Sequence, residues 1–494
     1  MATVYRHGTY GEFSPSSGGA ATQTGTVAVY VGSAPVNLIR GWSNAGVVNT
    51  PVLLTSLAAA RRLIGYSSKW DSFTLSEAVS VHFDNIAGNA GPIVAINVLS
   101  PKLHKKTETT TLSLTFVNGQ ARILSDTIIL DSLVLADKVE GVDFSIDYDW
   151  TSGQVMINSL GKTKITGTVN ATYSEVDPSM VAEADIIGGV TSGGEYTGLG
   201  CVDLVNQTFG IEPNLIVAPG WSDHPPVYEA MVKAGTNING QWNAFALADI
   251  PLATADGDRV DTEEAAQSWA AENGYISGRS KVYWPPVEAT NGSVCHLSTL
   301  AAWAIQTVDA SHGGVPMETE SNKPIPIVRQ YFGADSTNRG FDQQRANDLN
   351  AVGITTAVFF GGRWVIWGGH TAAYKFGAVT DKRVTFDTNV RMMMYILNSF
   401  HRDWALTVDQ PMTRALADTI KIREQEKADA LVAIGALIGA PKVDFIESEN
   451  GAADLSDGNF VWDFDGTPTP HLKSAAMRVG YTDAGFTTYF GGEV

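Results

Sequence analysis

The stretch GTVAVYVGSAP, residues 25–35, decides the fold class of this 494-residue chain. Its apolar residues are continuous rather than alternating, and turn-forming residues bound it, which is typical of a strand buried on both faces. Helical patterns follow at residues 56–66 and 75–91, and a second buried strand, PIVAINVLS, spans residues 92–100. Strand, helix, helix, strand is the order of an α/β layer domain.

The pattern changes at residue 101. Residues 101–185 alternate Thr, Val, Ile and Leu with polar residues between glycine and aspartate turns, which predicts an all-β unit. After residue 186 the α/β order resumes, with strands in PNLIVAPGW, WNAFALADIP and SKVYWPPV separated by helical patterns. The β-rich unit is therefore interpreted as an insertion into an α/β domain.

The last third starts with a strand-like stretch, NAVGITTAVFFGGRWVIWGGHTA at residues 350–372, followed by helical patterns at residues 388–404 and 409–435. Short strand-like segments then run to the C-terminus, and a similar extended segment precedes residue 25. A strand at each end of a globular body can pair with neighbouring chains, so the sequence points to assembly.

These patterns predict an α/β fold: an α/β core and a C-terminal α/β domain, with an inserted all-β domain and extended N- and C-terminal β-arms. The expected segments are an arm at 1–24, core at 25–100, insertion at 101–185, core at 186–345, a C-terminal domain at 346–460, and terminal strands with an arm at 461–494.

Composition limits the function. The formal charge is −19 without a basic block, which disfavours direct binding to nucleic acid or to an anionic membrane. The two cysteines, Cys201 and Cys295, make no disulfide framework and indicate a reducing compartment. There is neither a signal-peptide pattern nor an apolar run long enough for a membrane span, so we expect a soluble product made in the cytoplasm.

The candidate catalytic and metal-binding motifs of the sequence are all incomplete, which favours a non-enzyme. His296 beside Cys295 is too small a set for zinc and is interpreted as a structural histidine. The GKT at residues 161–163 lacks the glycine of a phosphate loop, and GWSDH at 220–224 lacks the second glycine of a nucleophile elbow. The glycine-flanked GGRWVIWGGH is interpreted as a strand that passes close to another backbone. We expect no catalytic, metal-binding or cofactor-binding residues and no cofactor.

Several stretches in order resemble the tail sheath proteins of contractile phages, R-type bacteriocins and related contractile injection systems. They are GTYGEFSPSS near the start, TVAVYVGSAP, TPVLLTSLAAARRLIG, NDLNAVGITTAVFFGGRWVIWGGHTA, VRMMMYILNSFHRDW and MTRALADTIKIREQEKADALVAIGALIGA. The similarity covers residues 1–100 and 186–494. No single motif is diagnostic, and the opening string departs from the family pattern because it lacks a second acidic residue.

The resemblance implies a structural subunit that polymerises as stacked hexameric rings around an inner tube and contracts to drive the tube through a cell envelope. The implied partners are other copies of the chain through arm exchange, the inner tail tube protein, and baseplate and tail terminator proteins, with no direct nucleic acid and no membrane insertion. The implied location is the phage tail of a virion, assembled in the cytoplasm of the host bacterium. Two alternatives remain at this point: another virion or surface structural protein, and an α/β enzyme with an inserted β lid.

Candidate interface residues follow from the same resemblance. The predicted inter-subunit arms contain Val4, Tyr5, Tyr10, Phe13, Phe486, Thr488 and Phe490. The predicted arm-accepting strands contain Val461, Asp463, Met477 and Val479. The candidates for contact with the tube form a local basic cluster on the second C-terminal helix: Arg414, Lys421, Arg423 and Lys427.

Overall fold

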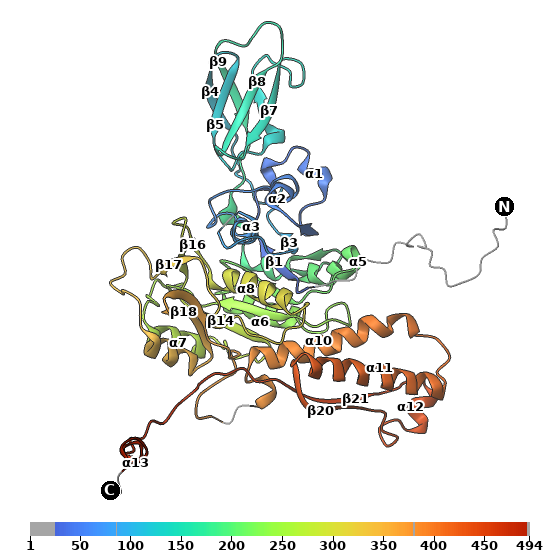
Figure 1. The fold of residues 1–494 in the computed structure, drawn as a ribbon. Helices are drawn as coiled ribbons and strands as arrows, with labels where there is room; N and C mark the ends of the chain where they lie inside the picture. Colours follow the sequence, from blue (N-terminus) through green and yellow to red (C-terminus); the bar gives the residue numbers. More distant parts are fainter. Residues whose placement is uncertain (1–24, 85, 379–380, 492–494) are drawn as a thin grey trace, which may run out of the picture.

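The computed structural model describes residues 25–84, 86–378 and 381–491. Its centre is an eight-stranded sheet in the order β19-β18-β14-β13-β12-β1-β3-β2 (Figure 1). The inner strands from β18 to β3 run parallel, and an antiparallel strand closes each edge. The strands are β1 (Ala28–Gly32), β2 (Pro51–Leu54), β3 (Ile93–Asn97), β12 (Leu215–Val217), β13 (Phe245–Asp249), β14 (Ser280–Tyr283), β18 (Ile354–Phe360) and β19 (Arg363–Trp367).

The prediction of a mixed α/β fold is confirmed. Every residue of β1 is buried, as its continuous apolar sequence predicts, because helices cover both faces of the parallel strands. The main covering helices are α2 (Leu57–Leu63), α3 (Leu75–Phe83), α6 (Pro225–Ala234), α7 (Glu263–Glu272), α8 (Leu297–Ser311) and α9 (Gln343–Asn350).

The β18–β19 hairpin confirms the interpretation of GGRWVIWGGH. Gly361 and Gly362 form its turn with positive φ angles of 59° and 82°. Gly368, just past β19, has a φ of 136°, and a Cβ there would lie 3.1 Å from the Thr355 Cα. The backbones therefore approach so closely that only glycine fits without strain.

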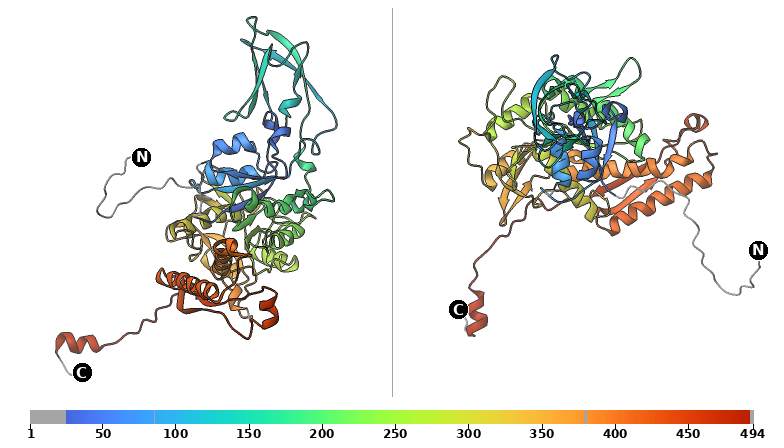
Figure 2. Two further views of the ribbon diagram at one scale, coloured as in Figure 1. Left: turned by 90° about the vertical axis from the view of Figure 1, so that its right-hand side faces the viewer. Right: turned by 90° about the horizontal axis from the view of Figure 1, so that it is seen from above.

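A β-rich unit projects from the core (Figures 1 and 2). It contains two three-stranded antiparallel sheets, in the orders β4-β9-β6 and β5-β8-β7, around their own apolar cluster, which includes Phe116, Phe144 and Ile157. The strands are β4 (Thr110–Phe116), β5 (Gln120–Leu124), β6 (Val134–Leu135), β7 (Phe144–Asp149), β8 (Gln154–Ser159) and β9 (Gly167–Tyr173).

The C-terminal unit lies on the opposite side of the core (Figure 1). The helices α10 (Asp387–Trp404) and α11 (Arg414–Ala433) pack beside a two-stranded antiparallel sheet. That sheet pairs β20 (Leu437–Asp444) with β21 (Asp463–Pro468), and α12 (Ala452–Ser456) lies between them in sequence.

The strands expected beyond β21 are absent from the described residues. Residues 469–483 contain no regular element, and Met477 and Val479 are 86% and 83% exposed rather than part of a sheet. The last described segment is a helix, α13 (Ala484–Phe490), so the predicted strand conformation of Phe486, Thr488 and Phe490 is wrong for the single chain. A strand needs a partner edge for its backbone hydrogen bonds, whereas a helix satisfies many of them internally.

Candidate interface elements

The described residues contain no catalytic constellation. Ser222 and His224 of GWSDH have different partners: the Ser222 hydroxyl donates to Asp249 over 3.2 Å, and the His224 Nδ1 lies 2.8 Å from Glu183. No group of three or more His, Cys, Asp and Glu within this part of the chain could hold a metal ion. None of the helices described is long and apolar enough to cross a membrane.

His296 has the structural role that the sequence predicts. Its Nδ1 lies 2.7 Å from one Glu77 carboxylate oxygen, and its backbone N–H donates to the other over 2.8 Å. Burial alone would lower the pKa of His296, but the charges of Glu77 and Asp249 outweigh it and raise the pKa to about 10. Cys295 and Cys201 are buried free thiols, and burial raises the pKa of both, to about 12 for Cys201.

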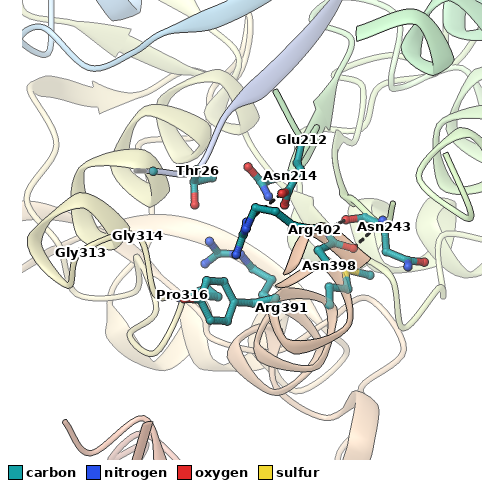
Figure 3. Close-up of a pocket in the computed structure, with 13 residues that line it drawn as sticks. Thr26, Glu212, Asn214, Asn243, Gly313, Gly314, Pro316, Arg391, Asn398 and Arg402 are labelled. Carbon is teal, nitrogen blue, oxygen red and sulfur yellow. Dashed lines mark hydrogen bonds and ion pairs between the residues drawn. The ribbon is translucent and has the colours of Figure 1, made fainter. Parts of the chain in front are cut away.

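Polar side chains join α10 to the core around a small cavity of about 80 Å³ (Figure 3). Arg402 donates to Glu212 over 2.8 Å. Asn398 accepts a hydrogen bond from the Asn243 backbone N–H over 3.0 Å and donates to its carbonyl over 2.9 Å. These groups bond to one another, so the cavity is part of a joint between two units of the fold.

Buried ion pairs hold the first turns of α10. The Lys281 ammonium on β14 lies 2.5 Å from Asp387 and 2.6 Å from Glu320, and all three side chains are at most 1% exposed. One turn along α10, Arg391 forms an ion pair with Asp309 of α8, which also accepts a hydrogen bond from the Thr26 hydroxyl. Burial would raise the pKa of Asp387, but Lys281 and its other cationic neighbours hold it below its usual range.

The outer edge of β20 is capped within the chain. The Val443 N–H donates to the Gln425 side-chain oxygen over 3.0 Å, and the Gln425 side-chain nitrogen donates to the Pro441 carbonyl. Because the Val443 N–H points away from β21, the facing pair Val443–Phe464 belongs to the non-hydrogen-bonded pairs of the ladder. Phe464 therefore directs its own N–H and C=O to the outer edge of β21.

An apolar groove of about 290 Å³ lies beside the start of β21. It lies between α10 and the segment that leads into β21, and Asp463 is the first residue of the strand. Val461, half exposed, is fixed just before β21 by hydrogen bonds of its backbone to Asn450. The groove is lined by Ile396, Leu397, Phe400, His401, Glu424, Val443, Phe460, Val461, Trp462, Asp463 and Phe464.

The C-terminal extension exposes aromatic side chains. On α13, Phe486 and Phe490 are 55% and 73% exposed, and their rings stack one helical turn apart with centroids 6.3 Å from each other. Thr488 is also exposed and donates to the Ala484 carbonyl. The other predicted arm residues, Val4, Tyr5, Tyr10 and Phe13, lie outside the described residues.

The basic cluster of α11 is less available than the sequence predicts. Lys421 lies 3.0 Å from Asp444 of β20, and Lys427 lies 2.6 Å from Asp403 of α10. Arg414 forms an exposed pair with Asp418 one turn along the helix. Arg423 is exposed, and no carboxylate among the described residues pairs with it. Two of the four cations therefore hold the C-terminal unit together.

Comparisons with known proteins agree with this architecture. The chain is 27% identical to the tail sheath protein of Burkholderia phage BcepMu over 94% of this chain and 98% of that protein. The chain belongs to the contractile phage tail sheath protein family. A second sheath relative, a putative prophage major tail sheath protein of Pseudomonas aeruginosa, is 28% identical over 63% of this chain and 75% of its own length. The tail sheath protein of Escherichia phage P2 is 24% identical over 61% of this chain.

Solved structures show the same fold at low sequence identity. A chain in the 6-fold symmetrised baseplate of the anti-feeding prophage matches with a TM-score of 0.54 at 14% identity, over 98% of this sheath protein and all of that chain. A chain of the PVC sheath complex in the contracted state matches with the same TM-score at 11% identity and the same coverage. No family model matches the sequence. Tail sheath proteins such as the BcepMu relative are structural proteins, so family membership removes the enzyme alternative.

Proposed function

We propose that this sheath protein polymerises as stacked hexameric rings around an inner tube and contracts to drive the tube through a target cell envelope. The observation that carries the proposal is a two-stranded sheet with an outward-facing β21 edge in a chain whose C-terminal extension is exposed. Copies of the chain pair through their arms. The inner tail tube protein, the baseplate and the tail terminator are the other partners, and the location is the virion tail, assembled in the host cytoplasm.

The acceptor is the outer edge of β21, where Phe464 supplies the outward backbone groups. Val461 and Asp463 lie in the same stretch, but the Val461 backbone already bonds to Asn450, and Asp463 pairs with Asp444 of β20. The β20 edge is already capped by Gln425, so the β21 edge is the favourable one for an incoming strand. A donated strand makes about four to six backbone hydrogen bonds, each worth a net ~0.5–1.5 kcal/mol. Apolar side chains of the arm fill the neighbouring groove, so each arm adds several kcal/mol to the link between subunits.

Each segment expected from the sequence has its own role in this proposal. The arms at 1–24 and 461–494 link subunits, the core at 25–100 and 186–345 forms the body, the unit at 346–460 faces the tube, and the insertion at 101–185 lies outside. In the C-terminal arm, residues 484–490 give up the helix α13 for a strand when a neighbouring edge is present. The helix is short and buries little in its own chain, so a sheet edge competes with it easily.

Electron microscopy of the chain assembled with its tube protein tests the proposal. Long striated hollow cylinders are expected, whereas shells or plates would favour another virion structural protein, and discrete particles would contradict polymerisation. Deletion of residues 2–12 or 484–494 should give folded monomers that do not polymerise. The matched control is Leu124→Ala, which removes a 77% exposed apolar side chain from the projecting β unit and should leave the cylinders intact.

A further inference from the structure

The start of the C-terminal extension is seated on the core rather than on the C-terminal unit that precedes it. In Figure 1 the extension runs back from β21 beneath the core before it leaves the molecule. The His471 ring meets the Phe386 ring edge-on with centroids 4.3 Å apart, and Phe386 immediately precedes α10. A Cβ added to Gly369 would lie 2.5 Å from the His471 Nε2, so the glycine leaves the space that this ring occupies.

Lys473 makes the second contact of the seat. Its ammonium lies 4.8 Å from the centre of the Tyr374 ring and donates to the Tyr374 hydroxyl over 3.2 Å. Tyr374 stacks on His370 with centroids 3.5 Å apart, and His370 stacks on Phe386 at 4.9 Å. These three rings form one continuous surface, which we call the aromatic seat. Apart from the Lys473 contact, the described residues from Leu472 onward are exposed, so the aromatic seat is the last described contact between the extension and the core.

The seat adjoins the buried ion pairs of α10. Phe386 belongs to the seat, and the next residue, Asp387, pairs with Lys281 of β14 in the middle of the sheet. Arg391 continues the connection to Asp309 of α8.

The same helix, α8, holds the other end of the described chain. Asp309 accepts from the Thr26 hydroxyl over 2.5 Å, and the Gln306 amide donates to the Thr26 carbonyl over 2.8 Å. The two ends of the folded body therefore contact side chains that are joined to one another at the first turns of α10.

We propose that His471 and Lys473 root the C-terminal extension in the core, and that the ion pairs of α10 join this root to Thr26. A mechanical force applied between the two ends is then carried by the core and does not load the sheet of β20 and β21. Without the seat, the same pull would act on Thr469, which bonds to Gly435 and Ala436 directly before β20. It would peel β21 from β20, breaking the ladder bonds one after another at low force.

This arrangement suits a subunit that is linked through its ends, because the acceptor edge on β21 keeps its shape while the subunit is stretched. The inference concerns a single chain, so it can fail while the proposed function holds. It can also hold if the chains assemble in another way.

Single-molecule pulling on the full chain, with handles at its two ends, tests the inference without any assembly. In His471→Ala and in Gly369→Ala, an early event at reduced force should release residues 445–468, a gain of at most about 90 Å. The unsubstituted chain should lack this event below the force that unfolds the core. The matched control is Leu472→Ala, which removes an 81% exposed neighbour and should behave as the unsubstituted chain.

The link to the other end has its own variant. Thr26→Val keeps the shape of the side chain and removes the hydroxyl that Asp309 accepts, so the first event that starts from the N-terminal side should occur at lower force. Thermal melting by circular dichroism verifies that each variant is folded before it is pulled. Unchanged force and length in both seat variants, or an unchanged force in Thr26→Val, would overturn the proposal.

Discussion

Replacement of Lys281 by methionine tests whether buried ion pairs hold α10 against the sheet. Lys281 is fully buried between Glu320 and Asp387, at 2.6 and 2.5 Å. Methionine fills much of the same volume but leaves two buried carboxylates without their cation. Loss of one partner from a buried ion pair costs about 3–5 kcal/mol. A folded domain is stable by only ~5–15 kcal/mol, so the effect would be a large part of the total.

The remaining donors moderate this cost. Tyr283 donates to Glu320 over 2.9 Å, and Thr319 donates to Asp387 over 2.9 Å. The double variant Lys281→Met/Glu320→Gln removes one of the two uncompensated charges, so it should recover part of the lost stability. A mutual gain of this kind is the signature of coupling in a double-mutant cycle.

The pH dependence gives a second readout. In the natural chain Lys281 helps to keep the pKa of Asp387 below its usual range, so this carboxylate stabilises the fold above its usual pKa and loses that contribution as pH falls. Without Lys281 the largest opposing charge is lost, so the pKa of Asp387 should rise. The carboxylates of the variant then take up protons as pH falls, and its stability gap to the natural chain should narrow from pH 7 to pH 5.

Urea unfolding of the monomer, followed by tryptophan fluorescence, measures all three chains at both pH values. A loss below about 1 kcal/mol in Lys281→Met, or a double variant less stable than the single one, would refute the reasoning. Either result would mean that the carboxylates find other compensation and that α10 is held by apolar packing.

Two further outcomes are expected. Despite burial, Glu77 and Asp249 raise the pKa of His296 to about 10, so the charged His296 stabilises the fold fully below about pH 6.5 and this stabilisation is lost as pH rises through about 10. Between pH 7 and pH 10, the free energy of unfolding in urea should therefore fall more for the natural chain than for His296→Gln. Equal falls in the two chains would contradict the assignment. Arg423→Glu should prevent assembly on tubes with an unchanged melting temperature, whereas Lys421→Glu should lower the melting temperature because it faces Asp444; normal assembly of Arg423→Glu would remove this face of α11 from the tube contact.

The sequence predicts the parallel sheet well because burial on both faces leaves a local mark. The residues of β1 are continuously apolar, and those of the β18–β19 hairpin carry glycines where the backbone turns or approaches another segment. Such constraints act on neighbouring residues of the chain and can be identified from a single sequence. The structural role of His296 was predictable for a related reason, since one histidine beside a cysteine is too few ligands for a metal.

The C-terminal extension could not be predicted in the same way. Phe486, Thr488 and Phe490 alternate as in a strand, while Phe486 and Phe490 also have helical i, i+4 spacing, and the single chain adopts the helix. Its conformation depends on whether a sheet edge is available, and the sequence of one copy does not contain that information.

The ion pairs of α10 were missed for a different reason. Lys281 and Asp387 are 106 residues apart, and the charged residues look ordinary within their own segments. The same holds for Lys421, which the sequence places in an available basic cluster but which the fold turns toward Asp444. Only the tertiary structure tells which charges are already paired.

A high-resolution image of the assembled sheath tests the central claim most directly. The account predicts that an extended segment from another copy lies along the outer edge of β21, with its backbone bonded to Phe464. A map in which both ends of each chain fold back on their own subunit, with the β21 edge uncovered, would contradict it.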